Sequence, residues 1–488
     1  MKTRHLFILI SVSFVSFCNA QWQLTGNANT TSTSFLGTTS AAPATGQDVT
    51  FKRASVTSGL LSTTKTSFGV NSLAMPNSVS FGVGAGQFSS GTGFNTYIGQ
   101  NAGKGVSVNN GNNNTFIGYN SGANNQNGSF NTALGSYSSQ SGGINNVSIG
   151  YEAAMSTTST DNVSIGYRAG KGNNGFRNIF LGSKAGGGNT DGNDNIVLGF
   201  ESGLVMTGGS NNIFMGNNSG RAFDNGGSNI FLGQNSGKNR YSSSANVFIG
   251  HNSGEYGTAG TGNAFLGNSS GANSSGNYNV MIGEGAGGEN GSGNNNVFIG
   301  KLAGFENLGS GNVLIGNETG NQDPNASNKL YIDNNETLNP LIWGDFAADQ
   351  LKFNGKVGIG GNTTAGFGSY PTTAGGVSVS NYNLFVTGGI LTEEVRVNLK
   401  GTNGQWADYV FAKDYDLKPL SEVETFINNN GHLPNVPCAE QVKEEGIELG
   451  EMAKIQQEKI EELTLYLIQQ NKQIEELKAQ VKLLLDKK

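Results

Sequence analysis

A five-residue pattern of polar and apolar positions recurs between residues 77 and 316. It contains Asn, a small or β-branched residue, a variable residue, Ile or Leu, and Gly, as in residues 246–250 (Asn-Val-Phe-Ile-Gly). Fifteen copies follow one another about 17 residues apart, and many are followed by a second element such as residues 251–254 (His-Asn-Ser-Gly). Short strands at a fixed period, separated by loops rich in Gly, Asn and Ser, predict one coil of a β-solenoid per copy. The recurring asparagine predicts side-chain amides that form a ladder along the axis.

The third position of the repeat is mostly aromatic or aliphatic. Strand side chains alternate between two faces, so the second and fourth positions share a face that we expect to be the coil interior. The third position then forms an outward stripe that is too apolar for a free surface. Either the stripe packs under a loop of its own coil or, as we favour, identical stripes from several chains face one another. The predicted interface residues are Tyr97, Phe116, Phe180, Phe214, Phe231, Phe248, Phe265 and Phe298.

From Leu449 to residue 488 the pattern changes to a heptad repeat. One core register holds Ala453, Ile460, Leu467, Ile474 and Val481, and the other holds Gln456, Leu463, Gln470, Leu477 and Leu484. Five heptads with charged flanks predict a coiled coil, and the alternative is a single amphipathic helix that folds onto the rest of the chain. Ile and Val with Leu favour two strands, whereas the two glutamines specify register more than strand number. The predicted helical interface is Ile460, Leu463, Leu467, Ile474, Leu477, Val481 and Leu484.

The repeats resemble the YadA-like head repeats of trimeric autotransporter adhesins. The copy most similar to the family form is residues 77–82, Asn-Ser-Val-Ser-Phe-Gly. The resemblance implies a left-handed parallel β-roll in which three chains pack into one head that adheres to host or matrix surfaces. The coils here are longer than the family repeat, and the chain ends in Leu-Asp-Lys-Lys rather than in a membrane-barrel strand. The autotransport mechanism is therefore not expected.

Segments outside the repeats resemble a group of exported Bacteroidota surface proteins. The resemblance is carried by residues 22–27 (Trp-Gln-Leu-Thr-Gly-Asn), 406–411 (Trp-Ala-Asp-Tyr-Val-Phe) and 431–437 (Gly-His-Leu-Pro-Asn-Val-Pro). It implies an exported surface or tail-fibre-like protein.

Composition narrows the class of protein further. The chain has 76 Gly and 65 Asn among 488 residues, and only 13% of its residues are charged, about half the usual share of roughly 25%. This composition argues against a compact α/β enzyme and a helical bundle. The net charge is −6 and basic residues do not cluster, so nucleic acid is not an expected partner.

The first twenty residues predict a signal peptide. A basic start precedes an apolar stretch that is too short to span a bilayer, and small residues precede the expected cleavage after Ala20. A lipoprotein acylated at Cys18 is the alternative, which the large Phe17 disfavours. Without Cys18, Cys438 is the one thiol, and in an oligomer it could pair between chains. No later run of apolar residues is long enough for a membrane span, so we expect an exported protein, extracellular or on the cell surface, with the periplasm as another option.

Candidate chemistry is sparse. Outside the predicted signal peptide the histidines are His251 and His432, in different regions, whereas a zinc site needs three or four close ligands. We expect His251 to be a surface variant of its repeat and His432 to pack in a turn. Glycine-rich stretches lack the Gly-Lys-Ser/Thr of a phosphate loop. The sequence predicts no catalytic residue, no cofactor and no metal, and hence no enzyme.

These patterns predict a mainly β protein that ends in a coiled coil. The expected organisation is a signal peptide (1–20), an N-terminal β or cap segment (21–76), a β-roll or parallel β-solenoid of about 15 coils (77–322), a β-rich neck (323–400), a connector module (401–448) and the coiled coil (449–488). The expected function is an exported homotrimeric structural or adhesive fibre. Its partners would be itself and a host, matrix or glycan surface. The alternatives are a glycan-binding or glycan-processing β-solenoid and a subunit of an extracellular tail-fibre-like assembly.

Overall fold

The computed structural model describes residues 49–360, 370–398 and 406–487, apart from short gaps at 54–55, 63, 91, 107–110, 156–157, 371, 375–376 and 387. The predicted signal peptide, with Cys18, and residues 21–48 of the predicted cap lie outside the described residues. The chain divides into two compact units, Met1–Asn354 and Gly355–Lys488.

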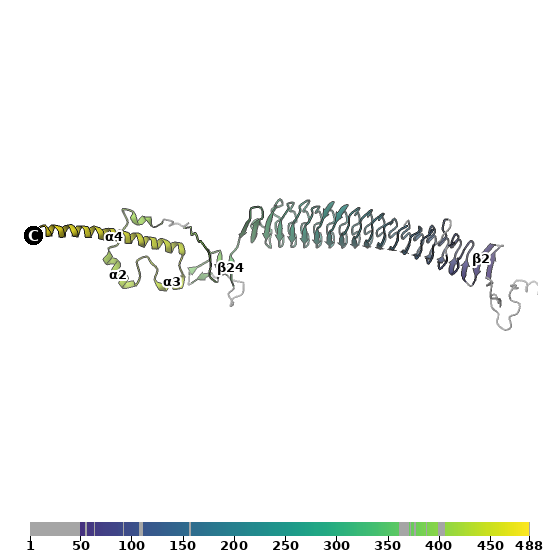
Figure 1. Cartoon of the computed structure of the whole chain (residues 1–488), viewed down its shortest axis with the longest axis horizontal. Coiled ribbons are helices and arrows are strands. Elements are labelled where there is room, and N and C mark those ends of the chain that lie inside the picture. Colours follow the sequence, from purple (N-terminus) through teal and green to yellow (C-terminus); the bar gives the residue numbers. More distant parts are fainter. Residues whose placement is uncertain are drawn as a thin grey trace, which may run out of the picture. The chain divides into compact units, whose positions relative to one another are not determined.

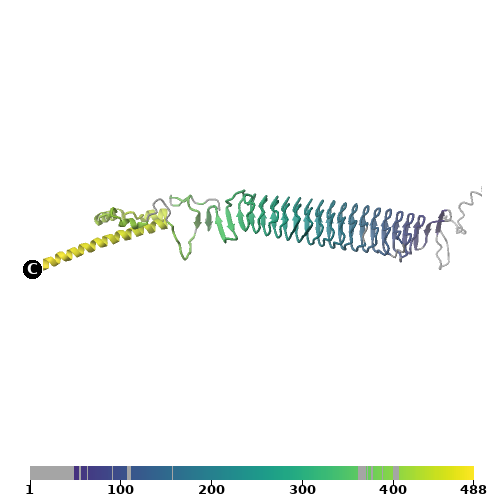
Figure 2. The same cartoon turned by 90° about the horizontal axis from the view of Figure 1, so that it is seen from above.

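The first unit is a parallel β-solenoid of about 15 coils, as the repeats predict (Figures 1 and 2). Each repeat forms one short strand that pairs in parallel with the strands of the coils before and after it; Val247, for example, lies between Ile230 and Ala264. The repeat strands are β4 (Ser78–Phe81), β5 (Thr96–Ile98), β6 (Thr115–Ile117), β7 (Thr132–Leu134), β8 (Val147–Ile149), β9 (Val163–Ile165), β10 (Ile179–Leu181), β11 (Ile196–Leu198), β12 (Ile213–Met215), β13 (Ile230–Leu232), β15 (Val247–Ile249), β17 (Ala264–Leu266), β18 (Val280–Ile282), β19 (Val297–Ile299) and β20 (Val313–Ile315). A second parallel pair, β14 (Ser242–Ser244) and β16 (Ala259–Thr261), lies in the loops of two coils.

The interior of the coils holds the third position of the repeat, so the predicted assignment of the two faces is wrong. The eight aromatic residues expected at an interface between chains are at most 1% exposed within a single chain: Tyr97, Phe116, Phe180, Phe214, Phe231, Phe248, Phe265 and Phe298. The rings of Phe214, Phe231, Phe248 and Phe265 stack from coil to coil, with centroids 4.7–4.9 Å apart. Stacked phenyl rings fill the interior of these coils, whereas Ala133, Ser148, Ser164 and Val197 take the same buried position in others.

The asparagine at the first position forms the predicted ladder, and the ladder is inside the coil. Asn246 is fully buried. Its side-chain Oδ1 accepts two hydrogen bonds from Asn263, one from the backbone N–H (2.9 Å) and one from the side-chain Nδ2 (3.1 Å). Its own Nδ2 donates to Asn229 Oδ1 at 3.1 Å and to the Gly260 carbonyl at 2.9 Å. In the first coil Ser78 takes this place, and its hydroxyl accepts from the N–H of Asn95. Each amide therefore joins neighbouring coils and satisfies a loop carbonyl.

Glycine closes each strand because a side chain there would collide with the next coil. Gly250 has φ 137°, and a Cβ at this position would lie 2.3 Å from the carbonyl oxygen of Gly267. Gly254, four residues later, has φ 60°, and a Cβ there would lie 2.7 Å from the ring of Phe248. The second glycine thus makes room for the buried ring of its own coil.

Antiparallel strands flank the solenoid at both ends. At the start, β1 and β2 pair antiparallel, β2 pairs antiparallel with β3, and β3 joins β4 in parallel. At the other end, β21 continues the parallel stack, and β22 and β23 follow it antiparallel, with Trp343 packed against the core. These strands are β1 (Val49–Arg53), β2 (Val56–Leu61), β3 (Lys65–Phe68), β21 (Lys329–Ile332), β22 (Ile342–Asp345) and β23 (Gln350–Phe353). They cover terminal coils that would otherwise expose the ends of the core.

The second unit contains the helices. Helix α4 (Leu449–Leu485) has 37 residues, and the 3-10 helix η2 (Ala407–Phe411) packs against it. Two shorter helices lie between them in the sequence: α2 (Leu420–Asn430) and α3 (Ala439–Glu445), whose N-cap is Cys438. The strand pairs are β24 (Val357–Ile359) with β27 (Leu384–Val386), and β25 (Thr373–Ala374) with β26 (Val377–Ser378).

Candidate interaction surfaces

Helix α4 presents its heptad positions to solvent along its whole length. We call the ten residues at the two core registers the heptad seam: Ala453, Gln456, Ile460, Leu463, Leu467, Gln470, Ile474, Leu477, Val481 and Leu484. All ten are exposed, and the apolar side chains from Ile460 to Leu484 are 48–69% exposed. An apolar row of this length is suited to a partner helix. A coiled coil itself stays a prediction, since one chain alone cannot form the contact.

The part of the second unit that precedes α4, residues 406–448, is here called the module. Through η2 and Tyr415 it packs on a different side of α4, and this side is charged. Glu458 and Glu461 are 7% and 5% exposed, although Ile460 between them is 57% exposed. The Tyr409 hydroxyl donates to Glu458, and the Tyr415 hydroxyl donates to Glu462. A helix that folded back to hide its apolar face would bury the heptad seam, and the opposite is found.

Lys459 ties the two carboxylates of this network together. Its Nζ lies 2.8 Å from Glu458 Oε1 and 2.8 Å from Glu462 Oε2. Burial and the Glu458 carboxylate raise the pKa of Tyr409 to about 12. Burial by itself would raise the pKa of the Glu458 carboxyl. Hydrogen bonds to the carboxylate, of which the one from Lys459 has the largest effect, hold this pKa below its usual value. The phenol therefore stays protonated and the carboxylate ionised near neutral pH, so the network anchors the module on α4.

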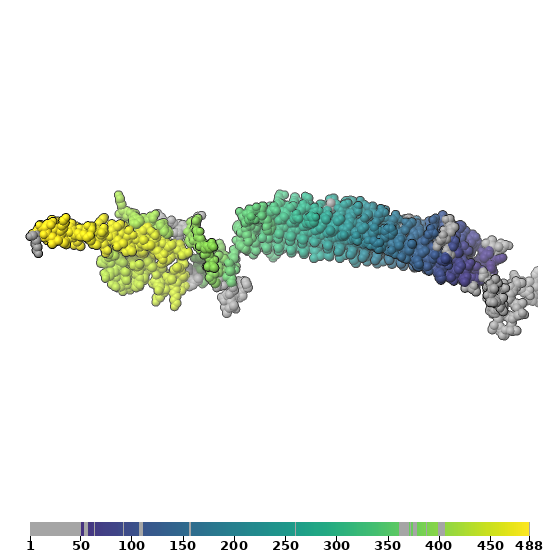
Figure 3. All heavy atoms as spheres, in the orientation of Figure 1, coloured from purple at the N-terminus to yellow at the C-terminus, as the bar shows by residue number. Residues whose placement is uncertain are grey.

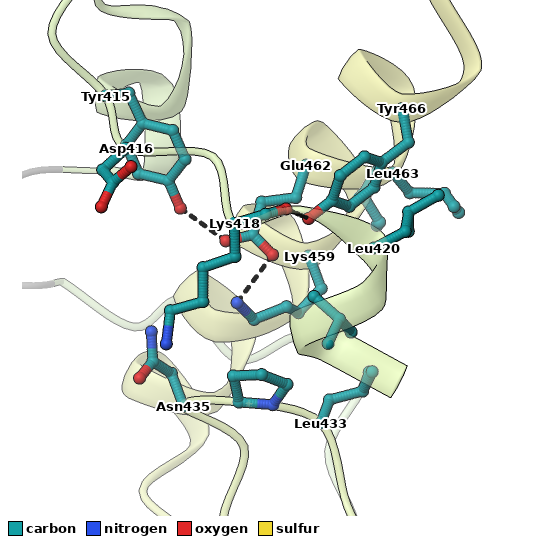
Figure 4. Close-up of a pocket in the computed structure, with 13 residues that line it drawn as sticks. Tyr415, Asp416, Lys418, Leu420, Leu433, Asn435, Lys459, Glu462, Leu463 and Tyr466 are labelled. Carbon is teal, nitrogen blue, oxygen red and sulfur yellow. Dashed lines mark hydrogen bonds and ion pairs between the residues drawn. The ribbon is translucent and has the colours of Figure 1, made fainter. Parts of the chain in front are cut away.

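A pocket of about 520 Å³ opens between α2 and α4 (Figure 4). Its apolar wall includes Leu420 and Val423 of α2, Leu433 of the following loop, and Ile460 and Leu463 of the heptad seam. Its polar lining is Tyr415, Asp416, Lys418, Asn435, Lys459, Glu462 and Tyr466, with Pro434 beside Leu433. Figure 4 shows the Tyr415–Glu462–Lys459 group beside this apolar wall. We call this the α2–α4 pocket.

The outer side of the solenoid sheet is aliphatic. We call the second and fourth positions of the five-residue repeat, which flank the buried third position in each repeat strand, the outer aliphatic face. Within it Ile98, Leu134, Ile179, Leu181, Ile196, Met215, Val247, Leu266, Ile282 and Ile299 are each 36–45% exposed. The coils form one continuous surface in the space-filling view (Figure 3). A monomeric protein rarely exposes an apolar patch beyond roughly 300–600 Å², which makes this face a candidate interaction surface.

Tyrosines form a second column on the outside of the coils. Tyr119, Tyr137, Tyr151 and Tyr167 lie on successive coils, with neighbouring ring centroids 5.2–6.1 Å apart. Tyr119, Tyr151 and Tyr167 are 42–43% exposed. The Arg168 guanidinium lies 4.9 Å from the centre of the Tyr167 ring, which holds that ring in place. This tyrosine column combines apolar ring faces with hydroxyl groups.

Charged side chains beside the tyrosine column pair between coils. Glu152 lies 2.8 Å from Arg168 Nε and 2.6 Å from Lys171 Nζ. Hydrogen bonds led by that from Lys171 lower the pKa of Glu152 to about 2, so it is ionised at neutral pH. Glu201 is bonded in the same way by Lys184 and Arg221. These pairs link neighbouring coils, and each of the two carboxylates is shared between two cationic side chains.

The two candidate histidines lie in different units of the structure. His251 is exposed, with its Nδ1 3.4 Å from Asn268 Oδ1, and His432 packs edge-on against Phe426. Among the described residues no group of three or more His, Cys, Asp or Glu side chains is placed to hold a metal ion. Within the same residues, no helix combines the length and apolar character that crossing a membrane requires.

The sequence predicts that both the aromatic stripe and the heptad seam are interfaces between chains. In the structure the two differ in their exposure to solvent. The stripe residues from Tyr97 to Phe298 are interior, whereas the seam residues from Ile460 to Leu484 are exposed. The outer aliphatic face, the tyrosine column and the α2–α4 pocket were not predicted from the sequence. Tyrosine at the position after the closing glycine, in three of four successive coils, was a usable signal for the column.

Comparison with known proteins adds no relative: no family model, no curated protein and no solved structure matches the chain.

Proposed function

We propose that the protein is an exported homotrimeric fibre protein with a structural or adhesive role and no catalytic activity. The observation that carries the proposal is the exposure of the heptad seam while the chain's own module packs on charged residues of the same helix. Helix α4 thereby keeps an apolar row free for other copies of the chain. The number of three chains follows from the resemblance to YadA-like heads, and export follows from the predicted signal peptide.

The outer aliphatic face supports the same assembly. Three solenoids that pack together through these rows would cover Ile and Leu side chains that one chain leaves 36–45% exposed. This moves the proposed contact between the solenoids from the aromatic stripe, which is interior, to the second and fourth positions of each repeat. A long surface built from repeats suits a fibre, whose binding is spread along its length rather than concentrated in one site.

Charges placed on the heptad seam are expected to dissociate the assembly. In the full chain without residues 1–20, we expect Ile474→Asp with Leu477→Asp to reduce the mass measured by light scattering from three chains to one. Both side chains are exposed on α4, at 48% and 59%, so the variant keeps its own fold. The matched control, Lys472→Asp with Ala479→Asp, places the same residue on another side of the helix and is expected to remain trimeric. A wild-type protein that is monomeric would contradict the proposal.

Glycan binding is a second candidate function, and the tyrosine column favours it. Aromatic rings flanked by hydroxyl and amide groups suit a sugar chain, because apolar C–H faces of sugars stack on rings while sugar hydroxyls form hydrogen bonds. The four rings follow one another along the coils at 5.2–6.1 Å, which gives an extended rather than a point-like platform.

Loss of two tyrosines tests this second function. We expect Tyr151→Ala with Tyr167→Ala to weaken binding to chitin or cellulose particles about tenfold, which corresponds to about 1.4 kcal/mol. The control, Tyr241→Ala with Tyr256→Ala, removes two tyrosines that are each 55% exposed elsewhere on the solenoid. Equal binding by both variants, or no binding by the wild type, would reject a role of the column in recognising these glycans.

A further inference from the structure

The α2–α4 pocket lies beside the heptad seam, between α4 and helix α2 of the same chain. Two seam residues, Ile460 and Leu463, form one wall, and Leu420 and Val423 of α2 form another. Ile460 and Leu463 remain 57% and 58% exposed in this position. A helix that covered the seam at this level would therefore lie beside α2.

We propose that the α2–α4 pocket is a docking site for helix α4 of a second copy of the chain. Each copy would then contribute α2 as well as α4 to the contact with its neighbour. The inference rests on the proposed function, because it assumes that α4 assembles with other copies, and it adds that residues 415–435 take part in the assembly.

The polar groups of the pocket favour an apolar occupant. Tyr415 donates to Glu462, Lys459 pairs with Glu462 at 2.8 Å, and the Tyr466 hydroxyl donates to the Lys418 carbonyl at 2.6 Å. These hydrogen bonds are made inside the chain by Tyr415, Lys459, Glu462 and Tyr466, so beside Asp416, Lys418 and Asn435 the pocket offers the apolar side chains of its wall. Such a wall suits Leu or Ile side chains.

The length of the seam argues that this apolar occupant is a helix. Exposed apolar side chains recur at heptad spacing from the pocket at Ile460 to Leu484, which is most of α4. A helix of the same length and period covers all of them, and α4 of another copy is such a helix. In a parallel, in-register assembly each pocket lies at the level of Leu463 of its neighbour, so closed symmetry fills every pocket in the same way.

The test changes Val423, which lies in the pocket wall but not on the heptad seam. Val423→Glu places a charge in the wall, and Val423→Phe fills the pocket from within. We expect each variant to raise the dissociation constant of the assembly at least tenfold, as measured by sedimentation and light scattering on the full chain. Ser421→Glu, on the same helix but not in the pocket, is expected to change it less than twofold. Val423→Phe keeps the pocket wall apolar. If Val423→Glu loses helical circular dichroism, the association of Val423→Phe therefore serves as the test of the pocket.

The outcomes separate this inference from the proposed function. If both Val423 variants associate like the wild type while Ile474→Asp with Leu477→Asp dissociates, the pocket has another occupant and the inference is wrong, although the assembly through α4 stands. If the wild type is monomeric, both are wrong. If the Val423 variants and the seam variant all dissociate and Ser421→Glu does not, the pocket belongs to the interface.

Discussion

Replacement of Phe248 by alanine is expected to lower the free energy of unfolding by about 3–5 kcal/mol, the range for a large buried aromatic residue. Phe248 is fully buried and stacks between Phe231 and Phe265, with centroid distances of 4.8 and 4.7 Å. Its removal leaves a cavity that the neighbouring coils cannot close, because the buried asparagines and closing glycines fix their spacing. Guanidinium denaturation followed by circular dichroism measures the change.

The control lies on the opposite face of the neighbouring strand. Leu266 is 45% exposed on the outer aliphatic face, so we expect Leu266→Ala to cost about 1 kcal/mol in the same experiment. Equal losses for the two variants, or a larger loss at Leu266, would mean that the interior and exterior of the coils are assigned the wrong way round. The comparison thus tests the orientation of every repeat strand, since all share one register.

The period of the repeat predicted the coils, but the apolar pattern alone could not tell inside from outside. Val247, Phe248 and Ile249 are all apolar, so both faces of this strand qualify as core by hydrophobicity. Two local signals pointed to the third position. Asn246 shares a face with Phe248, and its amide ladder is most valuable where water is excluded. Gly254 leaves room for the ring of Phe248, which is expected only if that ring points inward.

The C-terminal unit shows a different limit of sequence reasoning. Heptad spacing is a local property of one helix, and it identified the residues that are exposed along α4. The packing of α2 beside α4 depends on contacts such as the one from Tyr415 to Glu462, which lie 47 residues apart in the sequence. No local period records such a pairing, so the α2–α4 pocket could not be predicted.

The second large effect on stability is expected from a substitution in the amide ladder. We expect Asn246→Asp to lower the free energy of unfolding by about 3–5 kcal/mol at pH 7, the cost of leaving a buried charge without its partner. Aspartate has nearly the same shape as asparagine but replaces the Nδ2 donor with an oxygen. That oxygen would face Asn229 Oδ1 and the Gly260 carbonyl, the two acceptors that Asn246 now serves at 3.1 and 2.9 Å.

The loss is expected to depend on pH in a defined direction. Burial and the two facing acceptors disfavour a charged aspartate, so its pKa in the folded state lies above its unfolded value of about 3.9. Below the unfolded value the protonated acid can donate one hydrogen bond, and most of the stability is retained. Stability then falls as the pH rises through the folded pKa. Denaturation curves at pH 3.5 and pH 7 measure the difference.

Asn252 is the matched control for the ladder. It lies at an outer corner of the same coil, where its Oδ1 accepts from Asn235 Nδ2 at 3.0 Å, and an aspartate keeps that acceptor. Asn252→Asp is therefore expected to change stability by less than about 0.5 kcal/mol, as for an ordinary surface substitution. If Asn246→Asp were as mild as Asn252→Asp at pH 7, the buried amides would not hold the coils together. Stacking of rings such as Phe248 would then be the main force along the axis.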